Sequence, residues 1–256
     1  MSCAITSIFC PWADPDASDG HMTGDVIAGI RGDLAAAARH ETREGARRFF
    51  KEEVRMYGVK IPAVRAIARA YFPRDAEKAE IFALCEELLH SGYTEEAQIA
   101  YDWADRLQGA FAPEDFAVLE RWLHTFVANW AECDTLCTHA VGSFLAMYPA
   151  YLARLEGWAR SANRWVRRGA AVSLVLSARR GEFLEEIFAI ADLMLEDPDD
   201  LVRKGYGWML KEASKQHPGE VFMFVMARKE RMPRTSLRYA IEKLPADLRR
   251  QAMARG

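Results

Sequence analysis

The sequence predicts an all-α protein, built from antiparallel helix pairs that stack into a HEAT-like solenoid. Apolar residues recur with the 3.6-residue period of amphipathic helices from residue 25 onward, and no convincing alternating strand pattern interrupts them. Helix pairs recur roughly every 35–40 residues, a spacing typical of repeats that bury their apolar stripes on their neighbours. Such a stack has a concave face. A compact all-α bundle is the alternative.

Four helix starts stand out in the N-terminal half. Pro62 lies in the first turn of a helix over 61–72, where its missing N–H costs no hydrogen bond. Asp75 is expected to cap the next helix. Thr94 opens a third, because the two glutamates that follow it place negative charge at the positive end of the helix dipole. Pro113 starts the fourth.

Further helices are expected after residue 130, each bounded by Pro, Asp, Asn or Gly. The expected segments are about 133–147, 149–160, 163–177, 182–195, 198–216, 218–229 and 233–244. Residues 1–22 are rich in Asp, Ser, Gly and Pro and are expected to be a poorly ordered lead-in. A single repeat domain over 23–256 follows from this division.

The composition excludes several classes of protein. Half of the 256 residues are hydrophobic, which is enough for a substantial core, and no run of eighteen apolar residues exists to span a membrane. No basic segment precedes the short apolar stretch at the N-terminus, so no secretory signal is expected. Five cysteines without framework spacing fit a reducing cytoplasm.

No metal or nucleotide cofactor is expected, because the chain lacks a P-loop, a dinucleotide fingerprint and a metalloprotease helix. Cys133, Cys137 and His139 raise the possibility of a zinc site. No second pair of ligands follows them, which favours two buried, apolar-like cysteines instead.

Charge is distributed unevenly along the chain, although its formal sum is only −3. Residues 160–256 hold 19 Lys and Arg against 13 Asp and Glu, and residues 1–159 hold the other 15 against 24. An asymmetry of this kind indicates a polyanionic partner, or simply a charge-rich solvated surface. Any nucleic-acid binding is therefore expected to rely on the C-terminal repeats.

Three tryptophans lie beside charged residues at intervals that match the repeat. Stacked repeats would bring the three clusters side by side, and aromatic faces with guanidinium groups suit a cation or a nucleobase next to a phosphate. The clusters are Trp130 with Asp134; Trp165 with Arg167 and Arg168; and Trp208 with Lys204 and Lys211.

Each cluster also has a purely structural explanation. A single helical tryptophan usually belongs to the core, an arginine pair is usually a solvated surface, and Asp134 could cap a helix. Gly205 and Gly207 cost a helix about 1 kcal/mol each relative to alanine. Close approach of another backbone or of a ligand is expected to offset that cost.

Five motifs occur in order over about residues 40–245. They are YGVKIPAVR from Tyr57, Trp130-x-x-x-Asp134, Asn163-x-Trp165-x-x-Arg168, KGYGWMLKE from Lys204, and Pro233-x-x-Ser236-Leu-Arg238. In this order and spacing the chain resembles the DNA alkylation repair glycosylases built of HEAT-like repeats, the AlkD type.

The resemblance implies a concave, basic face that grips double-stranded DNA carrying alkylated bases. It implies excision of cationic N3- or N7-alkylated purines without a deep base-flipping pocket. The catalytic carboxylate of the family falls on Asp134, its flanking indoles on Trp130 and Trp208, and its backbone-holding arginine on Arg168.

The chemistry of these residue types agrees with that assignment. An alkylated purine is already a good leaving group, and the sugar then develops oxocarbenium-like charge that a carboxylate such as Asp134 can stabilise. Trp130 and Trp208 can offer π faces to that cation. Arg168 can neutralise a phosphate through a bidentate contact, and Lys211 can add another.

Two departures from the family pattern stand out. Phe49 and Phe50 occupy a region where the family often has a tyrosine, and Glu132 adds a carboxylate near the site. Two other functions stay open: a non-catalytic relative that binds damaged or branched DNA, and a HEAT-like scaffold for a protein partner. The complete set of Trp130, Asp134, Arg168 and Trp208 favours the glycosylase.

Overall fold

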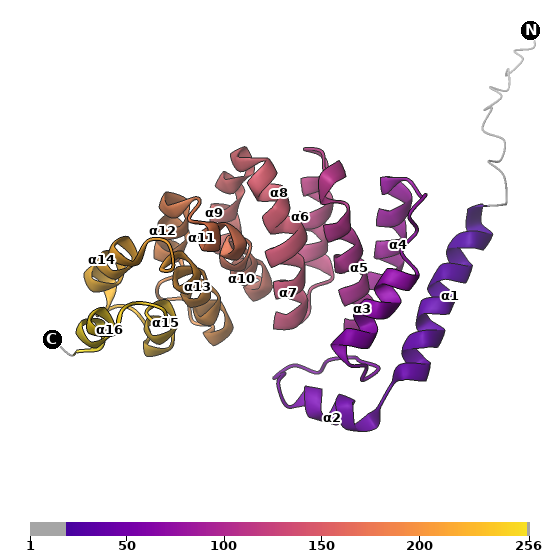
Figure 1. The fold of residues 1–256 in the computed structure, drawn as a ribbon, viewed down its shortest axis with the longest axis horizontal. Helices are drawn as coiled ribbons and strands as arrows, with labels where there is room; N and C mark the ends of the chain where they lie inside the picture. Colours follow the sequence, from indigo (N-terminus) through magenta and orange to yellow (C-terminus); the bar gives the residue numbers. More distant parts are fainter. Residues whose placement is uncertain (1–18, 255–256) are drawn as a thin grey trace, which may run out of the picture.

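The chain forms a curved, two-layer stack of helices in the computed structural model, which describes residues 19–254 (Figure 1). No strand occurs in this range. The predicted HEAT-like solenoid is therefore confirmed, and the compact bundle is wrong. The helices are α1 Asp19–Ala37, α2 His40–Arg47, α3 Ile61–Ala70, α4 Lys78–His90, α5 Thr94–Arg106, α6 Asp115–Thr125, α7 Trp130–Leu136, α8 Gly142–Met147, α9 Arg154–Ala159, α10 Arg164–Val172, α11 Val175–Arg180, α12 Leu184–Leu193, α13 Asp200–Ala213, α14 Pro218–Arg228, α15 Arg234–Ala240 and α16 Ala246–Met253.

One row of helices lies along the concave side of the stack. Consecutive members of this inner row pack on one another in the order α3, α5, α7, α10, α13 and α15. Figure 1 shows α4, α6, α9, α12 and α14 on the opposite, convex side. Residues from successive repeats thus meet side by side on the inner row.

Hydrogen bonds from tryptophan side chains connect neighbouring repeats. The indole N–H of Trp103 donates to the carbonyl of Ala68 at 2.8 Å, 35 residues earlier in the chain. The indole of Trp158 donates to the Glu120 carboxylate at 2.7 Å across a separation of 38 residues. These contacts join equivalent positions of adjacent repeats and confirm the predicted period.

The helix starts agree with the sequence where a cap or a proline determines them. Pro62 lies in the first turn of α3, and the Asn163 side chain caps α10 by accepting from the Trp165 N–H at 2.9 Å. The expected cap at Asp75 is wrong. Helix α4 begins at Lys78 because Glu77 caps it in a reciprocal capping box with Glu80.

Several boundaries differ from expectation. The expected helix 133–147 is α7, a π-helical turn over Cys137–Val141 and α8, and it begins at Trp130. The expected helix 163–177 is divided into α10 and α11, and α16 follows the last expected segment. Of the expected lead-in, residues 1–18 lie outside the described part, and α1 begins at Asp19.

Over the described residues, none of the helices combines the length and apolar character that a membrane crossing requires.

Candidate functional site

Helix α7 carries the two residues that the sequence marks most strongly. The Asn129 side chain caps this helix, because its carbonyl oxygen accepts from the N–H groups of Ala131 and Glu132, both at 3.0 Å. Asp134 is therefore not the cap, and its carboxylate is available for another task. Trp130 begins the helix, and Asp134 follows one turn later on the same face.

The Asp134 carboxylate is held by Arg168 of α10. The guanidinium Nε donates to Oδ1 at 2.8 Å and Nη2 donates to Oδ2 at 2.7 Å, so the contact is bidentate. The third nitrogen, Nη1, donates to the carbonyl of Leu201 on α13. Arg168 thus connects three helices of the inner row and gives the carboxylate one orientation.

This ion pair is largely shielded from water. The Arg168 side chain is 7% exposed and that of Asp134 is 18% exposed. Burial raises the pKa of the Asp134 carboxyl above its ordinary value, and the hydrogen bonds from Arg168 oppose that rise. Asp134 remains the more accessible partner, so it is the member of the pair that a ligand on the concave side can contact.

Trp130 is half-buried and leans on the connection between α2 and α3. Its indole N–H donates to the carbonyl of Phe49 at 3.2 Å, and its ring stacks on Phe50 with centroids 5.5 Å apart. The same connection is anchored on α10 by an ion pair between Glu52 and Arg164. Trp130 and Phe49 are 81 residues apart in the sequence, and Arg164 and Glu52 are 112 residues apart. The connection between α2 and α3 thus folds back onto α7 and α10.

Phe49 is 75% exposed beside Trp130. Glu132, by contrast, is buried, and its carboxylate accepts from the Thr94 hydroxyl at 2.8 Å and from the Ala128 N–H at 2.9 Å. Glu132 therefore points into the protein, away from the concave side, and adds no exposed carboxylate to the site.

Trp208 is half-buried on α13, two turns from Leu201 and on the same face of that helix. The glycines that precede it permit close packing. A Cβ on Gly207 would lie 2.7 Å from Cβ of Tyr239 on α15, and one on Gly205 would lie 3.4 Å from Cγ of Arg168. The expected close approach is confirmed as a contact with protein, and Gly205 leaves room for the arginine that holds Asp134.

The cations that the sequence pointed to have partners inside the protein. Arg167 binds the Asp197 carboxylate at 2.7 and 3.3 Å. Lys204 pairs with Asp200 at 2.8 Å and Lys211 with Glu242 at 3.3 Å. Trp165 is buried, with the Arg164 guanidinium 4.2 Å from its ring centroid.

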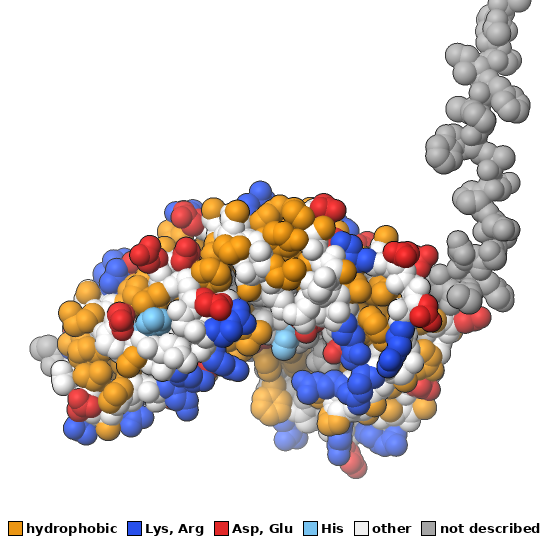
Figure 2. Space-filling view, turned by 45° about the horizontal axis from the view of Figure 1, so that its top comes forward, with side chains coloured by type: hydrophobic (Ala, Val, Ile, Leu, Met, Phe, Trp, Pro, Cys, Tyr) orange, Lys and Arg blue, Asp and Glu red, His pale blue; other side chains and the backbone are white. Residues whose placement is uncertain are grey.

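Other cations are exposed and form no ion pair with any described residue. This group includes two pairs on the inner row, one near each end, and several cations that precede α3. Figure 2 shows Lys and Arg side chains on both sides of the hollow. The two pairs are Arg65 and Arg69 on α3 and Arg234 and Arg238 on α15, and the cations before α3 include Arg48, Lys51 and Lys60.

A signal for the first of these pairs existed in the sequence. Arg65 and Arg69 lie one helical turn apart, and no acidic residue occupies a position three or four residues from either. The net negative charge of residues 1–159 gave no indication of these two arginines. Exposed, unpaired cations therefore occur in the N-terminal half as well, and many arginines and lysines of the C-terminal repeats are already paired. The expectation that nucleic-acid binding relies on the C-terminal repeats stays a prediction.

Cys133 and Cys137 are fully buried, and the Cys133 thiol donates to the carbonyl of Trp165 at 3.4 Å. Both cysteines are core residues, as predicted. Among the described side chains, no group of three His, Cys, Asp or Glu could hold a metal ion.

These features define an all-helical repeat protein in which an arginine of one inner-row helix, α10, orients a carboxylate of another, α7, one turn after Trp130. The family model described as DNA alkylation repair enzyme matches residues 30–244, and the chain belongs to that family.

A solved structure shows the same fold, and a second is similar at a lower score. The structure of a predicted DNA alkylation repair enzyme from Enterococcus faecalis is similar with a TM-score of 0.73 and 16% identity, covering 82% of this chain and 97% of that one. A Pseudomonas fluorescens alkylpurine DNA glycosylase, AlkC, bound to DNA containing an abasic site analog, has a TM-score of 0.48 and 15% identity over 90% of this chain and 65% of that one. No curated protein matches the sequence.

Proposed function

We propose that the protein is a DNA glycosylase that hydrolyses the glycosidic bond of cationic N3- or N7-alkylated purines in duplex DNA. The observation that carries the proposal is the Asp134 carboxylate on the inner-row helix α7, which Arg168 orients through both oxygens while the side chain stays 18% exposed. Membership of the DNA alkylation repair enzyme family agrees with this activity.

The reaction needs little from the protein beyond charge and position. As the bond from C1′ to the purine nitrogen breaks, its electron pair neutralises the cationic base, which leaves without a general acid. Positive charge then develops on the deoxyribose, and the Asp134 carboxylate stabilises it. Each carboxylate oxygen accepts one hydrogen bond from Arg168 and keeps a further lone-pair site, which can orient the attacking water.

The indoles of Trp130 and Trp208 supply the walls of this site. Both are half-buried, and their π faces can pack on the sugar as it becomes cationic. Phe50 stacks on Trp130 and keeps that indole in place. In this proposal the lesion meets these indoles on the concave side and is not drawn into a deep pocket.

The proposal divides the cationic residues by task. Arg168 is a positioning residue for Asp134, because all three of its nitrogens already have protein partners. Contacts with the DNA backbone fall to unpaired arginines at the two ends of the inner row, Arg69 on α3 and Arg234 and Arg238 on α15. A phosphate can bind these side chains without breaking an existing ion pair.

A second candidate function is non-catalytic binding of damaged DNA. The bidentate ion pair between Asp134 and Arg168 is also compatible with this function, because a carboxylate bound to arginine can be purely structural. Such a protein would keep salt-dependent DNA binding and release no base.

The test measures release of free base from a duplex that contains N7-methylguanine, under single-turnover conditions. The Asp134→Asn variant keeps the size of the side chain and loses its charge. Asp197→Asn is the matched control, since Asp197 is also paired with an arginine of α10 yet lies away from Trp130. We expect release by the wild-type protein and by the control, and a large loss in Asp134→Asn.

The other outcomes discriminate between the alternatives. No release by any protein, with salt-dependent binding of the duplex intact, supports the non-catalytic binder. Absence of both release and binding leaves the protein-interaction scaffold. Full release by a well-folded Asp134→Asn would place the catalytic group elsewhere.

A further inference from the structure

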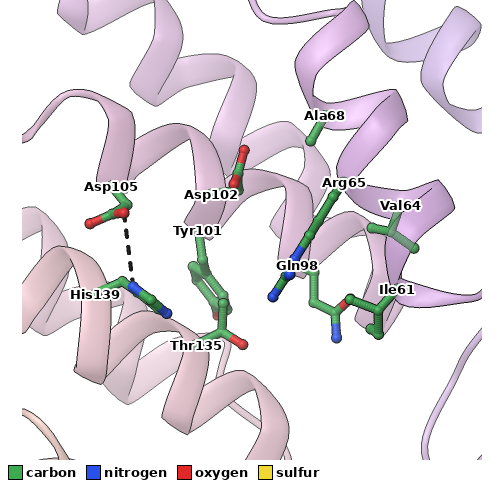
Figure 3. Close-up of a pocket in the computed structure, with 10 residues that line it drawn as sticks. All are labelled: Ile61, Val64, Arg65, Ala68, Gln98, Tyr101, Asp102, Asp105, Thr135 and His139. Carbon is green, nitrogen blue, oxygen red and sulfur yellow. Dashed lines mark ion pairs between the residues drawn. The ribbon is translucent and has the colours of Figure 1, made fainter. Parts of the chain in front are cut away.

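A second feature of the concave side is a cavity of about 400 Å³ between α3, α5 and α7 with the π-helical turn that follows it (Figure 3). Asp134 does not line it, but Thr135, the next residue, does. A volume of this order falls within the range of small-molecule sites. The cavity is therefore next to the proposed reaction centre and separate from it.

Hydrogen-bond donors and acceptors face this cavity from different helices. Arg65 of α3 and Gln98 of α5 extend toward its middle (Figure 3). Asp105 of α5 and His139 of the π-helical turn lie at the other end, with Oδ2 of Asp105 3.9 Å from Nδ1 of His139. Arg65 forms no ion pair with the rest of the described chain, so its guanidinium is free to bind a ligand.

Tyr101 contributes to the cavity wall from α5. Its side chain is fully buried, so a ligand in the cavity is expected to contact the polar groups of Arg65, Gln98, Asp105 and His139 instead of the Tyr101 hydroxyl.

The remaining walls are apolar. Val64 and Ala68 of α3 line one side, and the ring of Tyr101 lines another. Flat apolar surfaces with polar groups at two ends suit a planar heterocycle that carries acceptors on one edge and N–H donors on another. The cavity thus offers the complement of a purine base.

Purine chemistry fits the groups at both ends. A guanidinium such as that of Arg65 can donate to O6 of a guanine whose N7 is alkylated, and a carboxylate such as that of Asp105 accepts from ring and exocyclic N–H groups. Burial raises the pKa of this carboxyl, and the neighbouring His139 opposes that rise.

We propose that this cavity binds a purine base through Arg65 and Asp105, including the alkylated base that leaves the reaction centre. The choice of a purine rests on the proposed function, whereas the cavity and its polar groups do not. The expected ligand is the free base after excision, because the proposed reaction does not draw the lesion into the protein. A base still attached to DNA as an extrahelical nucleotide is the alternative that the second experiment distinguishes.

The first experiment titrates free 7-methylguanine into the protein by calorimetry, without DNA, with cytosine as the pyrimidine comparison. We expect saturable binding of the purine and at least a tenfold weaker affinity in Asp105→Asn. Asp192→Asn, on the convex helix α12, removes a carboxylate outside the cavity and is expected to leave the affinity unchanged. Because His139 is exposed, His139→Gln provides a second variant that folding defects do not threaten, and a severalfold loss is expected there.

The second experiment compares duplexes that carry one bulged guanine or one bulged cytosine. A bulged guanine that binds at least tenfold more tightly, with the preference lost in Asp105→Asn, supports the site and identifies the DNA-linked base as its ligand. Binding of free 7-methylguanine alone supports the site and identifies the released base. Absence of both effects, or equal affinity in Asp105→Asn, overturns the proposal.

These readouts do not depend on catalysis. A protein that binds purines but releases no base keeps the cavity proposal and loses the glycosylase proposal. A protein that releases base while neither purine probe binds keeps the glycosylase proposal and loses the cavity proposal.

Discussion

The role of Arg168 can be separated from a phosphate contact by the substitution Arg168→Lys. Lysine keeps the positive charge but cannot reproduce the planar fork that binds both oxygens of Asp134 and the carbonyl of Leu201. At least one of three charge-assisted hydrogen bonds is lost, at about 2 kcal/mol. For a chain of this size the melting temperature should fall by about 4–8 °C.

The effect on activity should be larger than the effect on stability. With its carboxylate free to rotate, the variant should release base about 10²-fold more slowly under single-turnover conditions at saturating protein. Affinity for duplex DNA, and the slope of log K against log salt concentration, should stay unchanged, because Arg168 is buried in the free protein.

The matched control is Arg238→Gln, which removes an exposed, unpaired cation from α15. It should reduce the salt slope by about 1 and leave the rate at saturation unchanged. If Arg168→Lys instead lowers the salt slope by about 1 and saturating protein restores its rate, Arg168 contacts a phosphate, and its role as a positioning residue is wrong.

Three further predictions follow from the site and its supports. Burial raises the pKa of Asp134, and the reaction needs the ionised carboxylate. The rate of base release should therefore fall with decreasing pH, with a midpoint above the ordinary carboxyl pKa of about 4. A pH–rate profile with its midpoint below that value would contradict the assignment. Gly207→Ala should lower the free energy of unfolding by about 1–3 kcal/mol in a urea titration, because its Cβ would press on α15, whereas Gly219→Ala, with open space around it, should not destabilise the fold. Phe50→Ala should cost about 1 kcal/mol of stability and slow base release at saturation, since it removes the ring on which Trp130 stacks; an unchanged rate would show that Trp130 needs no such support.

The sequence alone was sufficient for the class of fold, and it singled out Trp130 and Asp134 as the residues of the proposed reaction centre. Helical periodicity is a local property, so apolar spacing predicts the helices directly. Repeat length follows from it, because each helix pair must bury its stripe on the next pair. The motif around Trp130 and Asp134 likewise lies within a single helix turn, where spacing defines a shared face.

Local caps show where such reasoning loses precision. Asp75 and Glu77 are both acceptable caps by residue type, and the structure selects Glu77 because Glu80 returns a hydrogen bond from within the first turn. In the same way Asn129, not Asp134, caps α7. When one of two candidate residues caps a helix, the carboxylate of the other, such as that of Asp134, is available for a different contact.

Only the tertiary structure decided which charges are free. Arg168 meets Asp134 across 34 residues, and Glu52 meets Arg164 across 112, so these pairs depend on how repeats stack and how the connection before α3 folds back. Composition counts every arginine as a cation, but an arginine already paired with a carboxylate offers less to DNA than an unpaired one. Electrostatic pairing acts through space over a few ångströms, and for that reason the arrangement of the repeats, rather than the sequence of charges, determined the surface of this protein.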